Sequence, residues 1–263
     1  MDPISYNTYD TYDLLHYTLL PYGFTIGLSF KDYSTGQILK NVALGKTGDG
    51  APAVRPIDHS LSGDYVRYAL RRGALHLEIT CASQGERAAV RIRPLSQALR
   101  PVQISAYACF LWNTEGSCRK QGDKLIAESG KKSWKLFASG QKAEDLNTDV
   151  PHPQLLRLAD GPVYVYTEEV DDPEAFIEQK NNQRRLFFAS KPEYGQSPEL
   201  YRAMQAAIAW NTFYEPNGKR VITGVSRDWN VYNGGYALFC WDCFFSALLC
   251  AEFSQRLAED NFF

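Results

Sequence analysis

Residues 65–80 read YVRYALRRGALHLEIT, and this stretch decides the fold class. Residues 75–80 alternate apolar and polar side chains, which is the pattern of a strand with one buried face, and residues 65–70 are rich in the aromatic and apolar side chains of a strand. The four residues between them, 71–74, include a glycine and end each run. The stretch therefore predicts a β-hairpin.

The same alternation continues outward on both sides of this hairpin. Residues 24–30 alternate and are followed by a polar turn at 31–36, and further strands are expected at 88–94, 102–111 and 163–167. Regularly spaced strands of this kind are typical of two packed antiparallel sheets. We expect a mainly β chain with an antiparallel β-sandwich over residues 1–195.

The pattern changes after the last of these strands. Residues 172–182 predict a short helix with Pro173 in its first turn. Residues 184–190 suit a last strand or an extended crossing, and residues 191–196 suit a linker. Ser197 as N-cap and Pro198 at the first helical position predict a new helix.

Residues 196–263 predict the start of an α-helical domain. Leu200, Met204, Ala207, Ile208 and Asn211 fall at helical spacing. After a loop, residues 241–258 predict a helix that is apolar on nearly all sides. Such a helix belongs inside a larger helical body, so we expect the chain to be a piece of a longer protein or one chain of an assembly that completes it.

Composition limits the partners. The 263 residues carry 28 basic and 30 acidic side chains, a formal net charge of −2, so neither nucleic acid nor an anionic membrane is expected as partner. Aromatic residues make up 13% of the chain, which suits stacking on sugar rings but also suits any β-rich protein. A neutral small molecule is the expected partner. The oligomeric state is not indicated.

Targeting signals and membrane spans are not evident in the sequence. The N-terminus lacks a basic patch followed by an apolar run, and no apolar stretch has the length of a membrane span. We therefore expect a cytoplasmic protein.

Cysteine and histidine spacing predicts no metal and no cofactor. Six cysteines in a chain of this length do not require a disulfide framework. Cys240 and Cys243 form a Cys-x-x-Cys that could be a redox pair or half of a zinc site, but large apolar neighbours favour two cysteines on a buried helical face. The four histidines are not at ligand spacing.

Asp242 is the strongest candidate for a catalytic residue in the sequence. It lies in residues 239–245, FCWDCFF, where large apolar side chains surround a carboxyl group. Apolar surroundings disfavour the charged form of a carboxyl, and a neutral carboxylic acid is what glycoside cleavage needs to protonate the departing oxygen. The alternative is an N-cap, since aspartate is common at helix starts and the helix dipole favours its ionised form.

Three short motifs resemble glycoside hydrolase family 63, a group that includes processing α-glucosidases and bacterial relatives acting on α-glucosides or mannosylglycerate. They are SRDW at 226–229, the glycine pair at 234–235 and WDCFF at 241–245, in this order. Trp210 and Asn211 on the preceding helix also fit. The resemblance implies a β-sandwich followed by an (α/α)6 toroid, and an inverting hydrolysis of α-glycosides.

Site roles follow from this resemblance. Asp242 would be the general acid, and Arg227 would bond sugar hydroxyls or hold the surroundings of the acid. Trp229 and Trp241 would wall the sugar pocket, with contributions from Trp210 and Asn211. The alternatives are an ion pair between Arg227 and its neighbour Asp228, and core packing for the tryptophans.

Inversion also needs a second carboxylate that acts as base. The family takes it from a late helix of the toroid. Glu252 and Glu259 follow Asp242 on its own expected helix and cannot face it across a sugar, so the chain by itself is expected to turn over sugar negligibly. The rival readings are a non-catalytic β-sandwich module that binds carbohydrate or a partner, and, among enzymes, trehalase-like or glucoamylase-like hydrolases.

Overall fold

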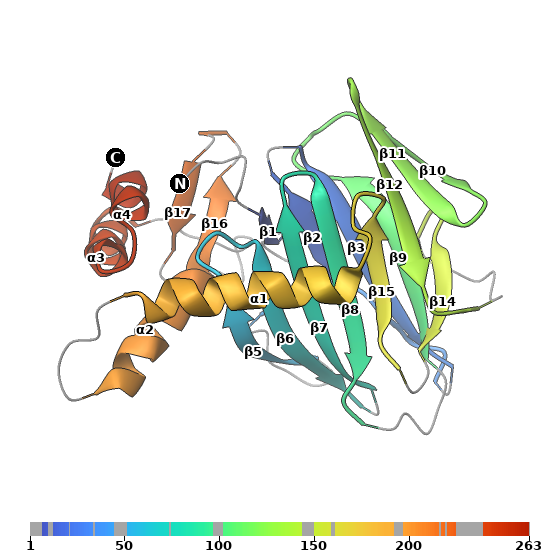
Figure 1. Cartoon of the computed structure of the whole chain (residues 1–263), viewed down its shortest axis with the longest axis horizontal. Coiled ribbons are helices and arrows are strands. Elements are labelled where there is room, and N and C mark those ends of the chain that lie inside the picture. Colours follow the sequence, from blue (N-terminus) through green and yellow to red (C-terminus); the bar gives the residue numbers. More distant parts are fainter. Residues whose placement is uncertain are drawn as a thin grey trace.

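The computed structural model describes residues 7–9, 13–20, 22–33, 35–44, 52–73, 75–96, 102–143, 150–158, 161–191, 197–215, 217–218, 220–224 and 239–262. Within these residues the chain is mainly β, with antiparallel pairing throughout. Two helices follow the strands of the two large sheets, and two more follow a short β-hairpin (Figure 1). The predicted fold class is thus confirmed at this level.

The first sheet has the order β1-β2-β3-β9-β14-β13, with β4 paired to β3. Its strands are β1 Asn7–Tyr9, β2 His16–Leu19, β3 Phe24–Asp32, β4 Ile38–Leu39, β9 Val102–Phe110, β13 Gln141–Lys142 and β14 Gln154–Leu158. Gly27 and Tyr107 are cross-strand partners on β3 and β9, and a Cβ at Gly27 would lie 2.3 Å from the Tyr107 ring. Only glycine lets that ring lie flat across the strand.

The second sheet has the order β10-β11-β12-β15-β8-β7-β6-β5. Its strands are β5 Ala53–His59, β6 Tyr65–Arg72, β7 Leu75–Gln84, β8 Arg87–Pro94, β10 Ser117–Gln121, β11 Lys124–Ser129, β12 Lys132–Ser139 and β15 Val163–Thr167. The hairpin predicted from residues 65–80 is confirmed, because β6 and β7 pair from Tyr65 with Ala82 to Arg72 with Leu75.

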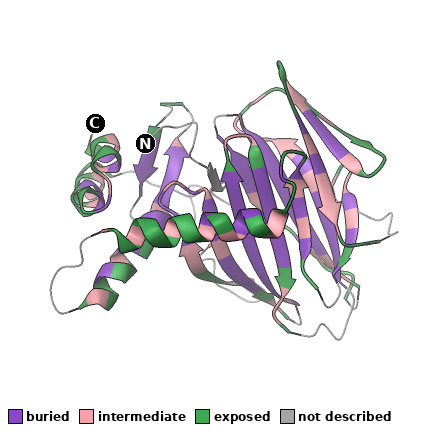
Figure 2. Cartoon of the chain, in the orientation of Figure 1, coloured by how far each residue is buried: buried purple, intermediate pink, exposed green. Residues whose placement is uncertain are grey.

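One hydrophobic core joins the two sheets, and buried residues run along the strands of both (Figure 2). Trp134 of β12 lies almost wholly buried and stacks on Phe24 of β3, with ring centroids 4.7 Å apart and an interplanar angle of 5°. This contact crosses from one sheet to the other. Burial of such rings supplies the main driving force for the face-to-face packing.

Helix α1, Pro173–Ala189, crosses the outer face of β6, β7 and β8 (Figure 1). Asp172 caps it by accepting a hydrogen bond from the Ala175 amide at 3.0 Å, and Pro173 lies at its start as predicted. The prediction of a strand or crossing at 184–190 is wrong, because the helix runs on to Ala189 before Ser190 caps its end.

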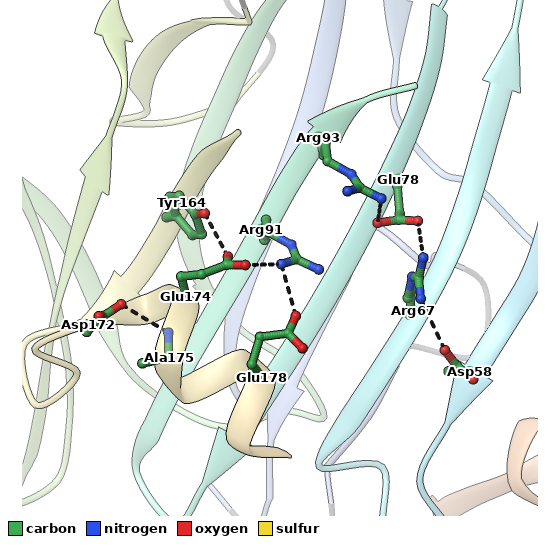
Figure 3. A network of polar contacts seen from close by, with 10 residues as sticks. All are labelled: Asp58, Arg67, Glu78, Arg91, Arg93, Tyr164, Asp172, Glu174, Ala175 and Glu178. Atoms are coloured by element: carbon green, nitrogen blue, oxygen red, sulfur yellow. Dashed lines mark hydrogen bonds and ion pairs between the residues drawn. The ribbon is translucent and has the colours of Figure 1, made fainter. Parts of the chain in front are cut away.

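Ion pairs hold α1 on the sheet (Figure 3). The guanidinium of Arg91 on β8 donates to Glu174 at 2.6 Å and to Glu178 at 3.2 Å. Burial by itself raises the pKa of Glu174, but hydrogen bonds from Tyr164 and Arg91 outweigh it, so the pKa lies below its usual value. Farther along the helix, Lys180 pairs with Asp64.

The apolar contact under the first half of α1 comes from a small cluster that includes Phe176 and Ile177. The docking therefore combines this cluster with charged contacts. Because α1 covers its outer face, β7 is buried on both sides over most of its length, rather than on the single face that the alternating pattern indicates.

The helical region contains α2 Pro198–Asn211, a hairpin of β16 Thr212–Glu215 and β17 Arg220–Thr223, then α3 Cys240–Ala251 and α4 Gln255–Phe262. Ser197 is the N-cap of α2 as predicted. The single helix expected over 241–258 is wrong. It breaks after Ala251, and the Ser254 hydroxyl accepts a hydrogen bond from the Leu257 amide at the start of α4.

A second hydrophobic cluster packs the helical region onto the β region. It joins Leu20 and Leu61 to side chains of α2, the hairpin, α3 and α4, among them Tyr201, Val221 and Leu257. The two regions proposed as domains, 1–195 and 196–263, therefore share a packed boundary within the described residues. The described helices do not amount to a toroid, which stays a prediction.

Lys180→Met tests the charged docking of α1. The Lys180 ammonium is 6% exposed and lies 3.0 Å from an Asp64 carboxylate oxygen, so its loss leaves a half-buried carboxylate without its cation. We expect the free energy of unfolding in urea to fall by about 2 kcal/mol. The matched control is Lys135→Met, whose partner Glu168 lies 2.6 Å away on the surface, with an expected change below about 0.5 kcal/mol.

A double-mutant cycle that combines Lys180→Met with Asp64→Asn measures the interaction energy between Lys180 and Asp64. Non-additivity between Lys180→Met and Asp64→Asn is expected because the two groups contact each other directly. Additive effects of the two substitutions would contradict the ionic docking.

Candidate functional site

Helix α3 positions the principal candidate, Asp242. Phe239 is the N-cap residue, the Cys243 amide donates to its carbonyl at 3.0 Å, and Asp242 falls in the first helical turn. The helix makes no side-chain capping hydrogen bond. Asp242 is therefore not the N-cap, and its half-buried side chain lies beside α2.

Asp242 lines a hollow of about 230 Å³ between α2, the end of β17 and α3. Asn211 of α2 and Thr223 of β17 line the same hollow, together with Phe245, Ser246 and Leu249 of α3. We call it the Asp242 hollow. It brings together two of the residues that the sequence singled out, Asp242 and Asn211, from two different helices.

Asn211 is fixed by its own helix. Its side-chain amide donates to the Ala207 carbonyl at 2.8 Å, and its backbone carbonyl accepts from the Gly224 amide at 3.0 Å. The second contact ties the end of α2 to the residue after β17. Within the described part of the chain, the Asn211 side-chain oxygen has no hydrogen-bond partner, so it can accept from a ligand hydroxyl.

A buried polar network forms the floor of the hollow. The Thr223 amide donates to the Asn261 side chain at 2.6 Å, and the Thr223 hydroxyl lies 2.9 Å from the hydroxyl of Thr212 and 3.4 Å from the thiol of Cys250. Burial raises the pKa of Cys250 to about 11, so this thiol stays neutral. The network links β16, β17, α3 and α4, and gives the hollow a rigid base.

The two predicted site tryptophans that the structure describes, Trp210 and Trp241, lie elsewhere. Trp210 is buried in the main core, with its ring centroid 4.9 Å from that of His59. Trp241 is 72% exposed and does not line the hollow. The expectation that Trp241 walls a sugar pocket and that Trp210 contributes to it therefore finds no support in their positions. For Trp210 the core alternative describes its surroundings.

Two other predicted contacts, Arg227 and Trp229, lie outside the described residues. The same holds for the whole SRDW motif and for the glycine pair at 234–235. Their roles stay predictions.

The aromatic niche expected around Asp242 is open to solvent. Trp241, Phe244, Phe245, Leu248 and Leu249 recur at three- and four-residue spacing on one side of α3 and are 40–72% exposed. We call this the apolar face of α3, and Figure 2 shows exposed residues on this helix. Of these five side chains, Phe245 and Leu249 line the hollow. A contiguous apolar face of this kind marks an interaction surface.

The cysteine pair does not form the buried face that the sequence favours. Cys240 is exposed and Cys243 is half-buried, while Cys250, one to two turns farther on, is buried. Both members of the pair are free thiols. No group of three or more potential metal ligands occurs among the residues that the structure describes.

Sequence reasoning missed the strand residues that shape the hollow. Thr223 and Gly224 belong to the end of a hairpin that was expected to be a loop. The signal was present in residues 216–218, Pro-Asn-Gly, which are typical turn residues between two short apolar runs.

Comparison with known proteins does not assign the chain: no family model matches it, and no curated protein matches it. The resemblance to glycoside hydrolase family 63 therefore depends on the short motifs alone. Among the described helices, none combines the length and apolar character that crossing a membrane requires.

Substitution of Phe245 and Leu248 by glutamine tests the apolar face. Because both side chains are mostly exposed, we expect the free energy of unfolding to change by less than about 0.5 kcal/mol. The fluorescence of a bound hydrophobic dye, anilinonaphthalene sulfonate, is expected to fall by about half or more, since the dye binds exposed apolar surface. Leu200→Gln is the control, because Leu200 is equally exposed on α2. Unchanged dye fluorescence in the double variant would contradict a continuous apolar face.

Proposed function

We propose that the protein is an inverting glycoside hydrolase acting on α-linked glucosides or related α-glycosides, with Asp242 as its general acid. The observation that carries the proposal is the shared position of Asp242 and Asn211 in one hollow. The motif resemblance assigns the two residues to one sugar site, and the geometry agrees with that assignment.

The lining of the hollow suits one sugar ring. Its volume of about 230 Å³ is below the roughly 300–1,000 Å³ typical of pockets for larger ligands. The Asn211 amide and the Ser246 hydroxyl offer hydrogen bonds to sugar hydroxyls, while Phe245 and Leu249 offer apolar contact to the ring faces. Neutral carbohydrate also agrees with the small net charge of the chain.

In the proposed reaction the Asp242 carboxyl gives its proton to the glycosidic oxygen as the bond to the anomeric carbon breaks. A water molecule attacks that carbon from the opposite face and gives its proton to a base. The two carboxyl groups of an inverting enzyme stand roughly 6.5–9.5 Å apart to leave room for this water. Among the described lining residues, Asp242 is the only carboxylate.

The base is therefore proposed to come from a late helix of a toroid that includes α2 and α3, as in the family that the motifs resemble. Such helices would pack on the apolar face of α3 and cover the hollow. Exclusion of water would then favour the neutral form of the acid, which proton donation requires. The same helices would bury the side chains that are now exposed on α3.

A second candidate function is a non-catalytic module that binds carbohydrate or a partner protein. The apolar face of α3 favours it, because an exposed apolar stripe on a helix can dock directly on a partner. In that case Asp242 would have no role in bond cleavage.

Asp242→Asn tests the proposed chemistry in the gene product at its natural length. Replacement of the carboxyl group by an amide removes the proton that the acid transfers and keeps the size of the side chain. We expect the rate of hydrolysis of α-linked disaccharides to fall by about 10²–10⁴-fold, with little change in the free energy of unfolding. The matched control is Glu259→Gln, which changes an exposed carboxylate on α4 and is expected to leave the rate unchanged.

Two results would count against the proposal. Hydrolysis by Asp242→Asn at the parental rate would remove Asp242 from the role of acid. Binding of oligosaccharides without hydrolysis of any α-linked disaccharide by the parent protein would favour the binding module.

A further inference from the structure

A cavity larger than the Asp242 hollow is lined by residues from the end of β5, the second half of α1 and the middle of α2. Its volume is about 570 Å³, within the roughly 300–1,000 Å³ of small-molecule sites. The polar side chains that line it are Asp58, His59, Arg184, Arg185, Arg202 and Gln205. We call this cavity the arginine cleft.

The charges of the arginine cleft favour an anion. Three arginines line it, against one aspartate. Asp58 is already engaged by two cations, with Arg184 at 2.9 Å and Arg67 at 3.5 Å. The lining of the cleft thus carries a net positive charge. A cleft lined mainly by one sign of charge concentrates its field on a bound group.

Arg184 is held in place before any ligand arrives. It is ion-paired to Asp58, donates to the Asn181 side chain at 3.4 Å and lies over the Tyr65 ring at 5.7 Å. Its Nε–H has no hydrogen-bond partner in the described part of the chain. A guanidinium fixed in this way is suited to the planar, two-point recognition of carboxylate or phosphate oxygens.

Gln205 is an independent sign of a ligand. Its side chain is 7% exposed and lines the cleft. No hydrogen bond to its amide occurs among the residues that the structure describes, so the amide is available to a ligand in the cleft. The amide can donate and accept at once, so it suits a polar group placed next to the anion.

We propose that the arginine cleft binds a small molecule that carries an anionic oxygen group, a carboxylate or a phosphate. Arg184 and Arg185 hold the anionic oxygens, and Gln205 bonds a neighbouring hydroxyl or carbonyl. The ligand joins α1 to α2 and so stabilises the packing of the helical region on the β region. The site is separate from the Asp242 hollow and does not depend on the proposed hydrolase activity.

Isothermal titration and thermal unfolding at constant ionic strength test this site. The probes are inorganic phosphate, glucose 6-phosphate and citrate, with glucose as the neutral comparison. We expect saturable binding and a raised melting temperature with at least one anion and not with glucose. Stronger binding of glucose 6-phosphate identifies a phosphate site, and stronger binding of citrate identifies a carboxylate site.

Arg185→Gln and Gln205→Leu locate the binding. Arg185 is exposed and makes no ion pair within the described residues, so its substitution tests the cleft without loss of packing, and we expect affinity to fall about tenfold or more. Arg71→Gln is the matched control, because Arg71 is an exposed arginine at the far end of the β5–β6 pair. Absence of binding by every anion, or equal weakening by Arg71→Gln, overturns the proposal.

Discussion

The docking of α1 on the eight-stranded sheet is the constraint on which the functional region depends. Lys180, almost fully buried, meets Asp64 at 3.0 Å, and Asp64 also accepts hydrogen bonds from the hydroxyls of Ser60 and Ser62. A buried ion pair needs such additional donors to offset its desolvation. The second half of α1 forms one wall of the arginine cleft, so this docking fixes that wall. Helix α2 lines both the arginine cleft and the Asp242 hollow.

The strands could be predicted from sequence because alternation is a local signal, and the hairpin expected at 65–80 forms, with its first strand two residues longer at the turn than the sequence indicated. The second half of α1 could not be predicted as a helix from the sequence. Its inward stripe, Ile177, Lys180, Arg184 and Phe188, has helical spacing, but two members are charged and form their ion pairs with carboxylates of a distant strand and loop. The break between α3 and α4 depends on one serine hydroxyl that caps α4, a contact that helix propensity does not anticipate.

The candidate site was predictable in part. Asp242 and Asn211 line one hollow, whereas their neighbours Trp241 and Trp210 point elsewhere. Successive residues on a helix are rotated by about 100° around its axis. Adjacent residues of a sequence motif on a helix therefore cannot all face the same ligand. The Asp242 hollow also needs Thr223, which the hairpin brings to α3, and such long-range placement is not visible in local patterns.

The most direct measurement of the central claim is the anomeric form of the first product, followed by proton nuclear magnetic resonance during hydrolysis of an α-glucoside. An acid at Asp242 working with a distant base and a water predicts that the β-anomer of the released sugar accumulates first and then equilibrates. Initial release of the α-anomer would contradict this account, because it requires a nucleophile attached to the protein in place of the water.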